Sequence, residues 1–505
     1  MQRNFMSITH ILFYFLLTSC SKGKVVNEPV KVDPVKIEIN MNSTAQTIRN
    51  FAASDAWAVQ FVGNWPDAKR NQMADWLFSM ETTAEGNPKG IGLTMWRTNI
   101  GAGSAQQGEA SGIRDEWRRA ASPLLNDNSE LVKAQNWFLA AAKQRGVNQF
   151  LAFYNSPPVN LTLNQKAFAN NGVCNISEAN MGEFAKSAVS SLKAIEAGAG
   201  IKFDYLSPVN EPQWDWSDGG QEGNPYTNAE VSKIVKSFHQ EFVANNLTTK
   251  LLIPESGHIR YLFPNSDKAN KDDQVKSFFD PSSNEYVGNL STVFKGVAAH
   301  SYFSTSPSEQ SINDRKKIRE VIAAKDGLEY WQSEYCILGD NGGEINGSRK
   351  DLGMTPALYI ARVIHQDLVY ANATAWQWWI SISPYDYKDG LIYIDKNKTD
   401  GNISDSKMMW ALGNYSRFLR PGMVRVDAAS NNSDLHVSAF KDAGGKLVLV
   451  VVNPSAIDKP LELTGLNKTE AITYTTSATE SLAKKTVQLK DLVVKKSSVM
   501  TVVVE

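Results

Sequence analysis

The chain has 505 residues, 42% of them hydrophobic, and its 52 basic and 53 acidic side chains leave a net charge of −1. The basic residues form no block or stripe, which argues against a nucleic-acid partner. The length allows a large core and more than one domain. Most of the 13 Trp and 16 Tyr residues are expected in that core, and the remainder suit a binding cleft.

The N-terminal residues predict export. Arg3 precedes an apolar run at 11–17 that is too short to span a bilayer and has the form of a signal-peptide core. The segment Leu17-Thr-Ser-Cys20 resembles a bacterial lipobox, which implies cleavage before Cys20 and lipidation of its thiol; an ordinary signal peptide with an incidental cysteine is the alternative. We expect a signal peptide over 1–19, a lipidated tether over 20–32, and an exported outer-membrane lipoprotein on the cell surface or the periplasmic face.

Strand-like and helix-like patterns alternate between residues 49 and 414. Such alternation predicts a parallel sheet, and eight units predict an α/β fold of the (β/α)8 TIM barrel type, which would be the catalytic domain. The eight expected strands are 49–54, 92–98, 149–154, 203–209, 250–254, 296–300, 328–333 and 373–379.

The residues after 414 change in character. Short β runs at 435–440, 446–453, 471–475 and 498–504 are separated by Gly, Asn and Asp, a pattern typical of an antiparallel sandwich. The alternating segment Val35-Lys-Ile-Glu-Ile-Asn40 precedes the barrel. We expect an appended antiparallel β-sandwich side domain, built from residues 415–505 and an N-terminal strand within 33–48.

Two glutamates follow strands of the expected barrel. Glu211 comes after the run at 203–209, and Glu334 comes after the run at 328–333. The chemistry of such barrels takes place at the C-terminal ends of the strands. Two carboxylates that face one pocket are what cleavage of a glycosidic bond needs, one as proton donor and one to attack or stabilise the sugar cation. The alternative interpretation of Glu211 is a surface carboxylate before a proline.

Six motifs in a fixed order, each close to an expected strand, resemble those of glycoside hydrolase family 30, a member of the large clan of retaining β-glycosidases on (β/α)8 barrels. The acid/base motif is matched by Val209-Asn-Glu-Pro212 and the nucleophile motif by Gln332-Ser-Glu334. In the first-strand motif, Asn50 and Ala52 replace the usual glycines. The remaining three motifs are matched by Arg97-Thr-Asn-Ile-Gly101, Tyr154-Asn-Ser-Pro-Pro158 and His300-Ser-Tyr302.

The resemblance implies that Glu211 is the acid/base and Glu334 the nucleophile. Arg97 and Tyr302 are expected to contact Glu334, where a guanidinium would keep the carboxylate ionised; a structural salt bridge is the alternative for Arg97. His300 is expected to position Glu211 or Tyr302, with a purely structural histidine as the alternative. Further substrate-binding or supporting residues are expected at Asp55, Tyr154, Asn210, Trp214 and Trp379.

We expect no cofactor and no metal, because two carboxylates suffice for the chemistry and no Cys/His cluster has metal-ligand spacing. Export would permit a disulfide between Cys174 and Cys336, but we favour a buried thiol at Cys336. The expected partners are a polysaccharide or oligosaccharide substrate and, through the lipid anchor alone, a membrane. We expect a monomer.

The loop that contains Gln213-Trp214 and Gln221-Glu-Gly223 resembles the family branch that cleaves β-1,6-linked galactan. We therefore expect an endo-acting enzyme on the β-1,6-galactan side chains of plant arabinogalactan, with Asp55 reading the galactose 4-hydroxyl. A β-1,6-glucanase or another family 30 β-glycosidase is the alternative. A catalytically inactive glycan-binding lipoprotein is the alternative of a different class, and an assay of reducing-end release separates the two classes.

Overall fold

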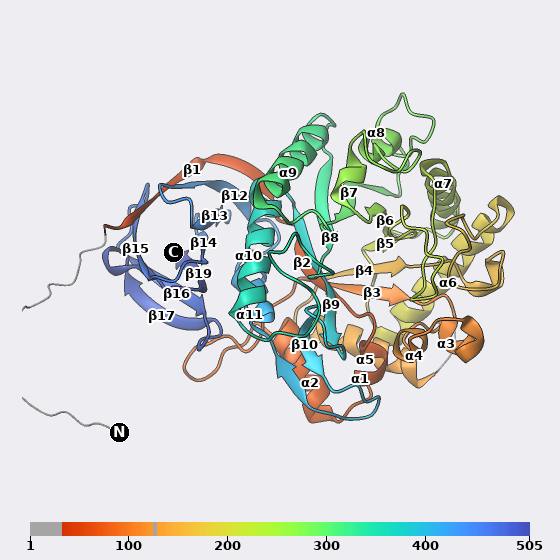
Figure 1. The fold of residues 1–505 in the computed structure, drawn as a ribbon, viewed down its shortest axis with the longest axis horizontal. Coiled ribbons are helices and arrows are strands. Elements are labelled where there is room, and N and C mark those ends of the chain that lie inside the picture. The colour runs from red at the N-terminus through yellow and green to blue at the C-terminus, as the bar shows by residue number, and fades with distance from the viewer. Residues whose placement is uncertain (1–32, 125–128) are drawn as a thin grey trace, which may run out of the picture. The chain divides into compact units, whose positions relative to one another are not determined.

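The computed structural model describes residues 33–124 and 129–505. The expected signal peptide, tether and lipidation site at Cys20 therefore lie outside the described residues. Within those two ranges, no helix combines the length and apolar character that a membrane span requires. Residues Pro34–Glu505 form one unit that contains a barrel and a β-sheet domain (Figure 1).

Eight parallel strands in the described part of the chain close into a barrel. They pair with one another in chain order, and β9 closes the ring by pairing with both β2 and β8. The predicted TIM barrel is confirmed. Its strands are β2 (Asn50–Ser54), β3 (Met95–Ile100), β4 (Gln149–Tyr154), β5 (Tyr205–Ser207), β6 (Lys250–Ser256), β7 (Val293–His300), β8 (Glu329–Glu334) and β9 (Ala375–Ser383).

Each expected barrel strand overlaps an observed one, and the differences lie at the ends. The second begins at Met95 rather than Gly92, because Gly92 has a φ of +60°, outside the strand region. The fourth ends at Ser207, just before Pro208, which has no N–H to give to the ladder. The fifth continues to Ser256 and so includes Glu255, which the sequence had placed beyond the strand.

Helices cover the outside of the barrel (Figure 1). One longer helix follows each barrel strand: α2 (Asp67–Phe78), α5 (Glu130–Gln144), α6 (Met181–Ala199), α7 (Asn228–Ala244), α8 (Gln274–Phe279), α9 (Ser308–Ala323), α10 (Met354–Val369) and α11 (Lys407–Ser416). Shorter turns are α1 (Val59–Val62), α3 (Ser104–Gln107), α4 (Glu116–Ala120), η1 (Gly108–Ser111), η2 (Val159–Leu161), η3 (Glu178–Asn180), η4 (Ile259–Leu262) and η5 (Leu489–Asp491). The start of α7 is fixed by a capping box in which Thr227 and Glu230 satisfy each other's backbone N–H groups.

The C-terminal residues form the expected second domain, and the N-terminal strand joins it. In Figure 1, β1 (Val35–Thr47) runs beside the strands of the C-terminal domain; it pairs with β12 in the antiparallel sense and with β15 in the parallel sense. The other strands are β12 (Val424–Ser430), β13 (His436–Lys441), β14 (Leu447–Asn453), β15 (Lys459–Thr464), β16 (Glu470–Thr476), β17 (Ala483–Gln488), β18 (Val493–Val494) and β19 (Ser498–Val504). Two further strands, β10 (Gly390–Ile394) and β11 (Ile403–Asp405), extend the barrel sheet beyond β9.

Strand β14 is buried along its whole length because its two faces enter two different cores. Val448, Val450 and Val452 belong to the barrel core, whereas Leu447, Leu449 and Val451 belong to the core of the sandwich. A continuous apolar run is typical of a strand that is covered on both faces. Helix α10 packs on β14 from the barrel side, and α11 packs on the neighbouring strands β19 and β16, so the two domains share a hydrophobic boundary.

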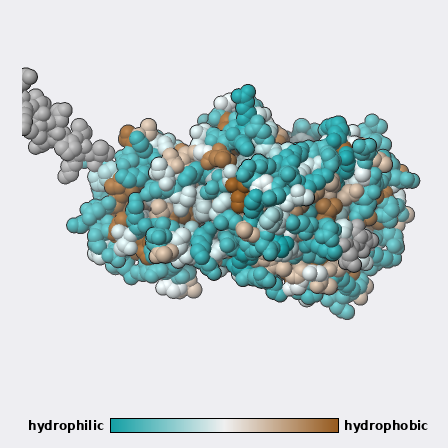
Figure 2. Space-filling view, turned by 90° about the horizontal axis from the view of Figure 1, so that it is seen from below, coloured by the Kyte–Doolittle hydropathy of each residue, from teal (hydrophilic) through white to brown (hydrophobic). Residues whose placement is uncertain are grey.

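The surface is mostly polar. Figure 2 shows one face of the molecule on which hydrophobic residues form only small, separated groups among hydrophilic ones. Scattered exposed apolar side chains such as Leu163 and Val173 are ordinary on a soluble domain. The chemistry of this protein is therefore sought in the cleft at the barrel rim.

A hydrogen-bond pair crosses the boundary between the two domains and generates a stability prediction. Thr501 Oγ1 donates to the main-chain oxygen of Asn414 at 2.6 Å and accepts from Asn414 Nδ2 at 2.9 Å, and both residues are fully buried. Thr501→Val keeps the shape but removes the donor to the buried Asn414 main-chain oxygen and one of the two acceptors of its Nδ2, which still donates to the Tyr474 oxygen. We therefore expect a loss of about 1–3 kcal/mol in the free energy of unfolding. Urea denaturation measures it, and Thr486→Val, on an exposed strand position, should change stability far less; equal effects would contradict the assignment.

Candidate active site

A cleft of about 840 Å³ lies at the rim where the barrel strands end. Both glutamates that the sequence singled out, Glu211 and Glu334, line it. The lining combines eight aromatic side chains with six carboxylates and one guanidinium. The aromatic residues are Trp57, Trp214, Trp216, Tyr302, Phe303, Trp379, Tyr385 and Tyr387; the charged ones are Glu211, Asp215, Asp218, Glu334, Asp386, Asp389 and Arg118.

The two glutamates reach the cleft from different backbone settings. Glu334 is the last residue of β8, so the strand itself aims its side chain. Glu211 lies four residues past the end of β5 and has a φ of +46°, in the left-handed region that residues with a side chain seldom adopt. Its backbone N–H donates to the main-chain oxygen of Glu255 at 2.8 Å, which ties the turn to the neighbouring strand β6.

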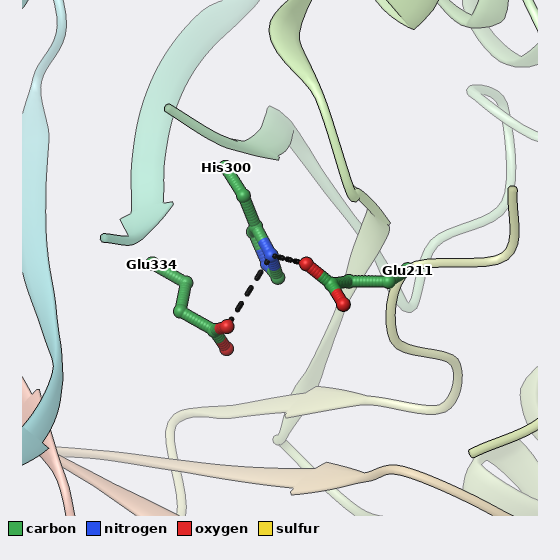
Figure 3. Close-up of side chains that lie close together, drawn as sticks. All are labelled: Glu211, His300 and Glu334. Atoms are coloured by element: carbon green, nitrogen blue, oxygen red, sulfur yellow. Dashed lines mark hydrogen bonds and ion pairs between the residues drawn. The ribbon is translucent and has the colours of Figure 1, made fainter. Parts of the chain in front are cut away.

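His300, the last residue of β7, lies between the two carboxylates. Its Nδ1 is 2.8 Å from Glu211 Oε1 and 3.5 Å from Glu334 Oε1, and Figure 3 shows the imidazole pointing into the gap between them. One atom from each of Glu211, His300 and Glu334 can be chosen so that all three lie within 4.8 Å of one another. The two carboxylates are thus close neighbours on one side of the cleft.

Glu334 is held by two further donors. Arg97, the third residue of β3, donates from a terminal nitrogen to Glu334 Oε2, and the Tyr302 hydroxyl donates to Oε1 at 3.0 Å. Arg97 also donates to Asn210 Oδ1 at 3.1 Å, and Asn210 donates in turn to Asn155 at 3.1 Å. The amide of Asn210 is therefore fixed beside Glu211 at the cleft wall, where the sequence analysis expected it.

A third buried carboxylate, Glu255, completes the cluster, and the sequence analysis missed it. Its Oε2 lies 3.2 Å from His300 Nε2 and accepts from the Ser333 hydroxyl, while Oε1 accepts from Ser207 Oγ at 2.6 Å and lies 3.9 Å from Arg97. Glu255 is fully buried and does not line the cleft. The position of a carboxylate at the end of a barrel strand could have identified Glu255. The expected strand ended at Pro254, so Glu255 was placed outside it.

The charges of this cluster set its protonation. Burial alone would lower the pKa of His300, but Glu334, Glu211 and Glu255 outweigh it and raise that pKa to about 10. Burial would raise the pKa of Glu255, but Arg97 and His300, with Ser207, outweigh it and lower that pKa to about 2. His300 is therefore an imidazolium at neutral pH, held by an ionised Glu255.

Glu211 differs from Glu255 in the direction of its shift. Burial raises the pKa of Glu211 above its ordinary value, because a buried carboxyl group is disfavoured in its charged form, and the negative charge of Glu334 acts in the same direction. The hydrogen bond and the charge of His300 offset part of that rise. Glu211 is thus the carboxyl group of the cluster that is suited to hold and release a proton.

Trp214 and Trp379 line the cleft as expected, but Asp55 and Tyr154 do not. The oxygens of Asp55 accept from the Asn99 N–H at 2.8 Å and from Gln135 of α5 at 2.7 Å, and the ring of Tyr154 packs on Phe184 of α6. Both side chains therefore point toward the helices outside the barrel. Asp55 lies one residue past β2 and Tyr154 is the last residue of β4, and neither is placed to contact a sugar in this cleft, contrary to what the sequence led us to expect.

The loop after Glu211 is fastened by residues that the sequence had associated with substrate choice. Glu222 is buried and accepts from the Ala102 N–H at 2.8 Å and from the Ser104 hydroxyl at 2.5 Å. Gln213 is also buried and accepts from the Gly257 N–H at 3.0 Å. These two side chains hold the loop, and the loop presents Trp214 and Gln221 to the cleft.

The remaining candidates concern the thiols and metal ligands. Cys174 and Cys336 are both free; Cys336 is buried and lies 4.0 Å from the Tyr302 hydroxyl.

Among the described residues, Glu211, His300 and Glu334 form the group with metal-like spacing. Because His300 carries a proton at neutral pH, its imidazolium already supplies the positive charge between these carboxylates.

A barrel with two carboxylates at its rim defines a glycosidase-type site, and the sequence comparisons give the family. The chain matches the model described as O-Glycosyl hydrolase family 30 over residues 34–393 and the Glycosyl hydrolase family 30 beta sandwich domain over residues 422–502. It therefore belongs to glycoside hydrolase family 30. Glucuronoxylanase XynC of Bacillus subtilis (strain 168) is 32% identical over 126 residues, which cover 22% of this chain and only 27% of that protein.

Solved structures give the same fold. A conserved exported protein from Bacteroides fragilis has a TM-score of 0.85 and 32% identity, over 93% of this chain and 100% of that one. The catalytic domain of GH30 xylanase C from Talaromyces cellulolyticus has a TM-score of 0.67 at 20% identity, covering 93% and 100%. The endo-β-1,6-glucanase BT3312 has a TM-score of 0.65 at 15% identity, covering 94% of each chain. At such identities the last two establish the fold alone.

The charge cluster predicts that His300 has an unusually high pKa. In a ¹⁵N NMR titration of the imidazole groups, we expect His300 to keep both ring protons to about pH 10, whereas His258 and His436, whose pKa values burial lowers to about 4, are neutral above pH 6. Glu255→Gln removes one of the negative charges that stabilise the imidazolium and should lower the pKa of His300. A wild-type His300 that titrates near pH 6.5 would refute this charge balance.

Proposed function

We propose that the protein is a retaining glycosidase that cleaves by double displacement, with Glu334 as nucleophile and Glu211 as acid/base. The observation that carries the proposal is the approach of the two carboxylates, whose selected oxygens lie within 4.8 Å. Retaining enzymes keep their carboxyl groups about 5–5.5 Å apart, whereas inverting enzymes leave about 6.5–9.5 Å for a water molecule. Membership of family 30 and the positions at strand ends support the same assignment.

In the first step, Glu334 attacks the anomeric carbon while Glu211 gives its proton to the departing oxygen. Glu334 must be ionised to attack, and Arg97 and Tyr302 stabilise that form by donating to both of its oxygens. Glu211 must be protonated to donate, and its burial favours the protonated form. The opposite protonation of two neighbouring carboxyl groups thus follows from their different partners.

In the second step, the glycosyl–Glu334 ester is hydrolysed. Once Glu334 is esterified, its negative charge is lost, so the pKa of Glu211 falls and the residue is ready to act as a base. Glu211 takes a proton from water, the water oxygen attacks the anomeric carbon, and Glu334 departs as a carboxylate. His300, fixed by Glu255, keeps Glu211 in place through both steps.

The substrate we propose is β-1,6-linked galactan of the arabinogalactan type, cut internally. The eight aromatic side chains of the cleft suit several sugar subsites, and the loop that carries Trp214 and Gln221 resembles the galactanase branch. β-1,6-Glucan, the substrate of the alternative that the sequence left open, is the second candidate. Six carboxylates against one guanidinium give the cleft a negative potential that disfavours glucuronate-bearing xylan, despite the sequence similarity to a glucuronoxylanase.

The location we propose is the outer membrane, where a lipid on Cys20 would anchor the enzyme as a monomer. The lipobox-like segment supports the anchor, and the resemblance to an exported Bacteroides fragilis protein supports export. A glycan-binding protein without activity is disfavoured, because Glu211 and Glu334 keep the donors and the spacing that turnover requires.

Substitutions of the two glutamates are expected to impair activity in different ways. Glu334→Gln should abolish turnover on every substrate, because no nucleophile remains. Glu211→Ala should cleave polysaccharide at least about a hundredfold more slowly, yet retain activity on dinitrophenyl glycosides, whose leaving group needs little protonation, and added azide should yield a glycosyl azide. Equal loss on both kinds of substrate would contradict the acid/base role.

The pH dependence should be bell-shaped. Activity declines as pH rises through the raised pKa of Glu211, since the deprotonated residue cannot donate. His300 stabilises the ionised form of Glu211, so His300→Gln should raise the pKa of Glu211 and move the alkaline limb of kcat/KM to higher pH. His239→Gln, at a histidine outside the cleft, should leave the limb unchanged, and a shift to lower pH in His300→Gln would oppose the proposed coupling.

The substrate assignment is tested on a panel of β-1,6-galactan, β-1,6-glucan and glucuronoxylan with wild-type enzyme. We expect β-1,6-galactan to be cut at least about tenfold faster than β-1,6-glucan, since one mismatched hydroxyl typically costs about 1–3 kcal/mol, and glucuronoxylan to be cut slowest. Oligosaccharides of mixed length at early times would indicate internal cleavage. Faster cleavage of β-1,6-glucan would replace the galactan assignment by the glucanase one.

A further inference from the structure

Two charged residues in the wall of the cleft take no part in the chemistry described above. Arg118 belongs to α4, in the connection after β3, and Asp389 lies in the loop between β9 and β10. Both line the cleft that holds Glu211 and Glu334. A role for this pair in recognising the substrate rests on the proposed glycosidase function of the same cleft.

The guanidinium of Arg118 is held in place by aromatic rings while few of its donors are used. It lies 4.3 Å from the ring centre of Trp57 and 5.4 Å from that of Tyr385. One terminal nitrogen donates to the Gly220 oxygen at 3.4 Å, a long bond, and its buried Nε has no hydrogen-bond partner in the described part of the chain. A guanidinium has five N–H donors, so several of them are left for a ligand.

Asp389 likewise has hydrogen-bonding capacity that is not used, in its case as an acceptor. It is buried, and its Oδ1 has no hydrogen-bond partner among residues 33–124 and 129–505. Its main-chain oxygen accepts from Trp378 Nε1 at 2.7 Å, which fixes the loop. Burial raises the pKa of Asp389 to about 6, and the bond with Ser383 and the charge of Arg118 offset part of that rise.

Arg118 and Asp389 are close enough for their charges to interact, yet no ion pair joins them within the described residues. Unused hydrogen-bonding capacity at buried groups is costly unless a partner supplies it. A hydroxyl group suits both residues at once, because it accepts from the guanidinium and donates to the carboxylate. A carboxylate ligand would be repelled by Asp389, and an ammonium ligand by Arg118.

We propose that Arg118 and Asp389 form a sugar-binding subsite that recognises hydroxyl groups on one neutral hexose unit of the substrate, with Trp57 and Tyr385 as the flanking aromatic surfaces. Rotation of the Asp389 carboxylate about its last bond, a broad torsion, turns Oδ1 toward the bound hydroxyl. Both residues touch the substrate in this assignment, so both determine specificity.

Contacts join this subsite both to the nucleophile and to the loop that follows Glu211. From Glu334 a chain of contacts runs through Arg97, Trp379 and Trp57 to Arg118. Arg118 also donates to the Gly220 oxygen, in the loop after β5 that carries Trp214 and Trp216. Arg118 and Asp389 are thus part of the same cleft as the two catalytic carboxylates.

Binding to an inactive enzyme tests the subsite without turnover. The background is full-length Glu334→Gln, and the probe is a tetrasaccharide prepared from whichever neutral glycan of the panel the wild type cuts fastest. We expect Asp389→Asn and Arg118→Gln each to weaken Kd in calorimetry by about tenfold, as for a hydrogen bond to a charged group. The double variant should lose less than the product of the two single effects, because one sugar unit is shared.

Asp458→Asn, on the surface of the sandwich and paired with Lys495, removes the same charge away from the cleft and should leave Kd unchanged. Unaltered binding in Asp389→Asn and Arg118→Gln, with the wild type still cutting the glycan, overturns the subsite and leaves the glycosidase function standing. A wild type that cuts no glycan overturns both. If Arg118→Gln does not fold, Arg118→Lys keeps the charge but loses the planar fork, and it must also weaken binding.

Discussion

The balance of charge at the end of the barrel is the constraint on which the site depends. Three carboxylates, Glu211, Glu255 and Glu334, are buried with two cations, Arg97 and His300, and burying a charge is costly unless it is paired. These five groups come from β3, β6, β7 and β8 and from the turn after β5, so only a closed barrel brings them together. The excess negative charge favours a proton on one carboxyl group, and burial together with the charge of Glu334 raises the pKa of Glu211, which is therefore the group suited to hold it.

Backbone geometry serves the same cluster. Glu211 and Glu255 both have positive φ values, 46° and 54°, and such conformations in residues with side chains persist only where the surroundings enforce them. The hydrogen bond from the Glu211 N–H to the Glu255 oxygen joins the turn after β5 to strand β6, while Glu222 and Gln213 fasten the loop that follows. The positive φ values, the attachment of the loop and the pairing of charges are therefore all found at the ends of the neighbouring strands β5 and β6.

The sequence predicted the barrel well because its buried strands are continuous apolar runs such as Gln149–Tyr154. For the same reason it could not predict which face of a strand a residue occupies. Strands covered on both sides show no alternation of polar and apolar residues, so nothing in the sequence indicated that Tyr154 packs on α6 rather than facing the cleft. Glu211 and Glu334 were found through motifs at strand ends. Glu255 follows a proline and has no such motif, and Arg118 and Asp389 lie in connections without periodicity.

The position of β1 has a consequence for how the protein is made. Its partners β12 and β15 begin at Val424 and Lys459, so the first strand to be synthesised waits for nearly the whole chain before it can pair. Contacts this distant in sequence form slowly, and an unpaired strand edge invites association between chains. Lys36, Glu38 and Asn40 alternate with the apolar Val35, Ile37 and Ile39. Charged side chains on a strand oppose pairing between chains, so Lys36 and Glu38 suit a strand whose own partners are synthesised last.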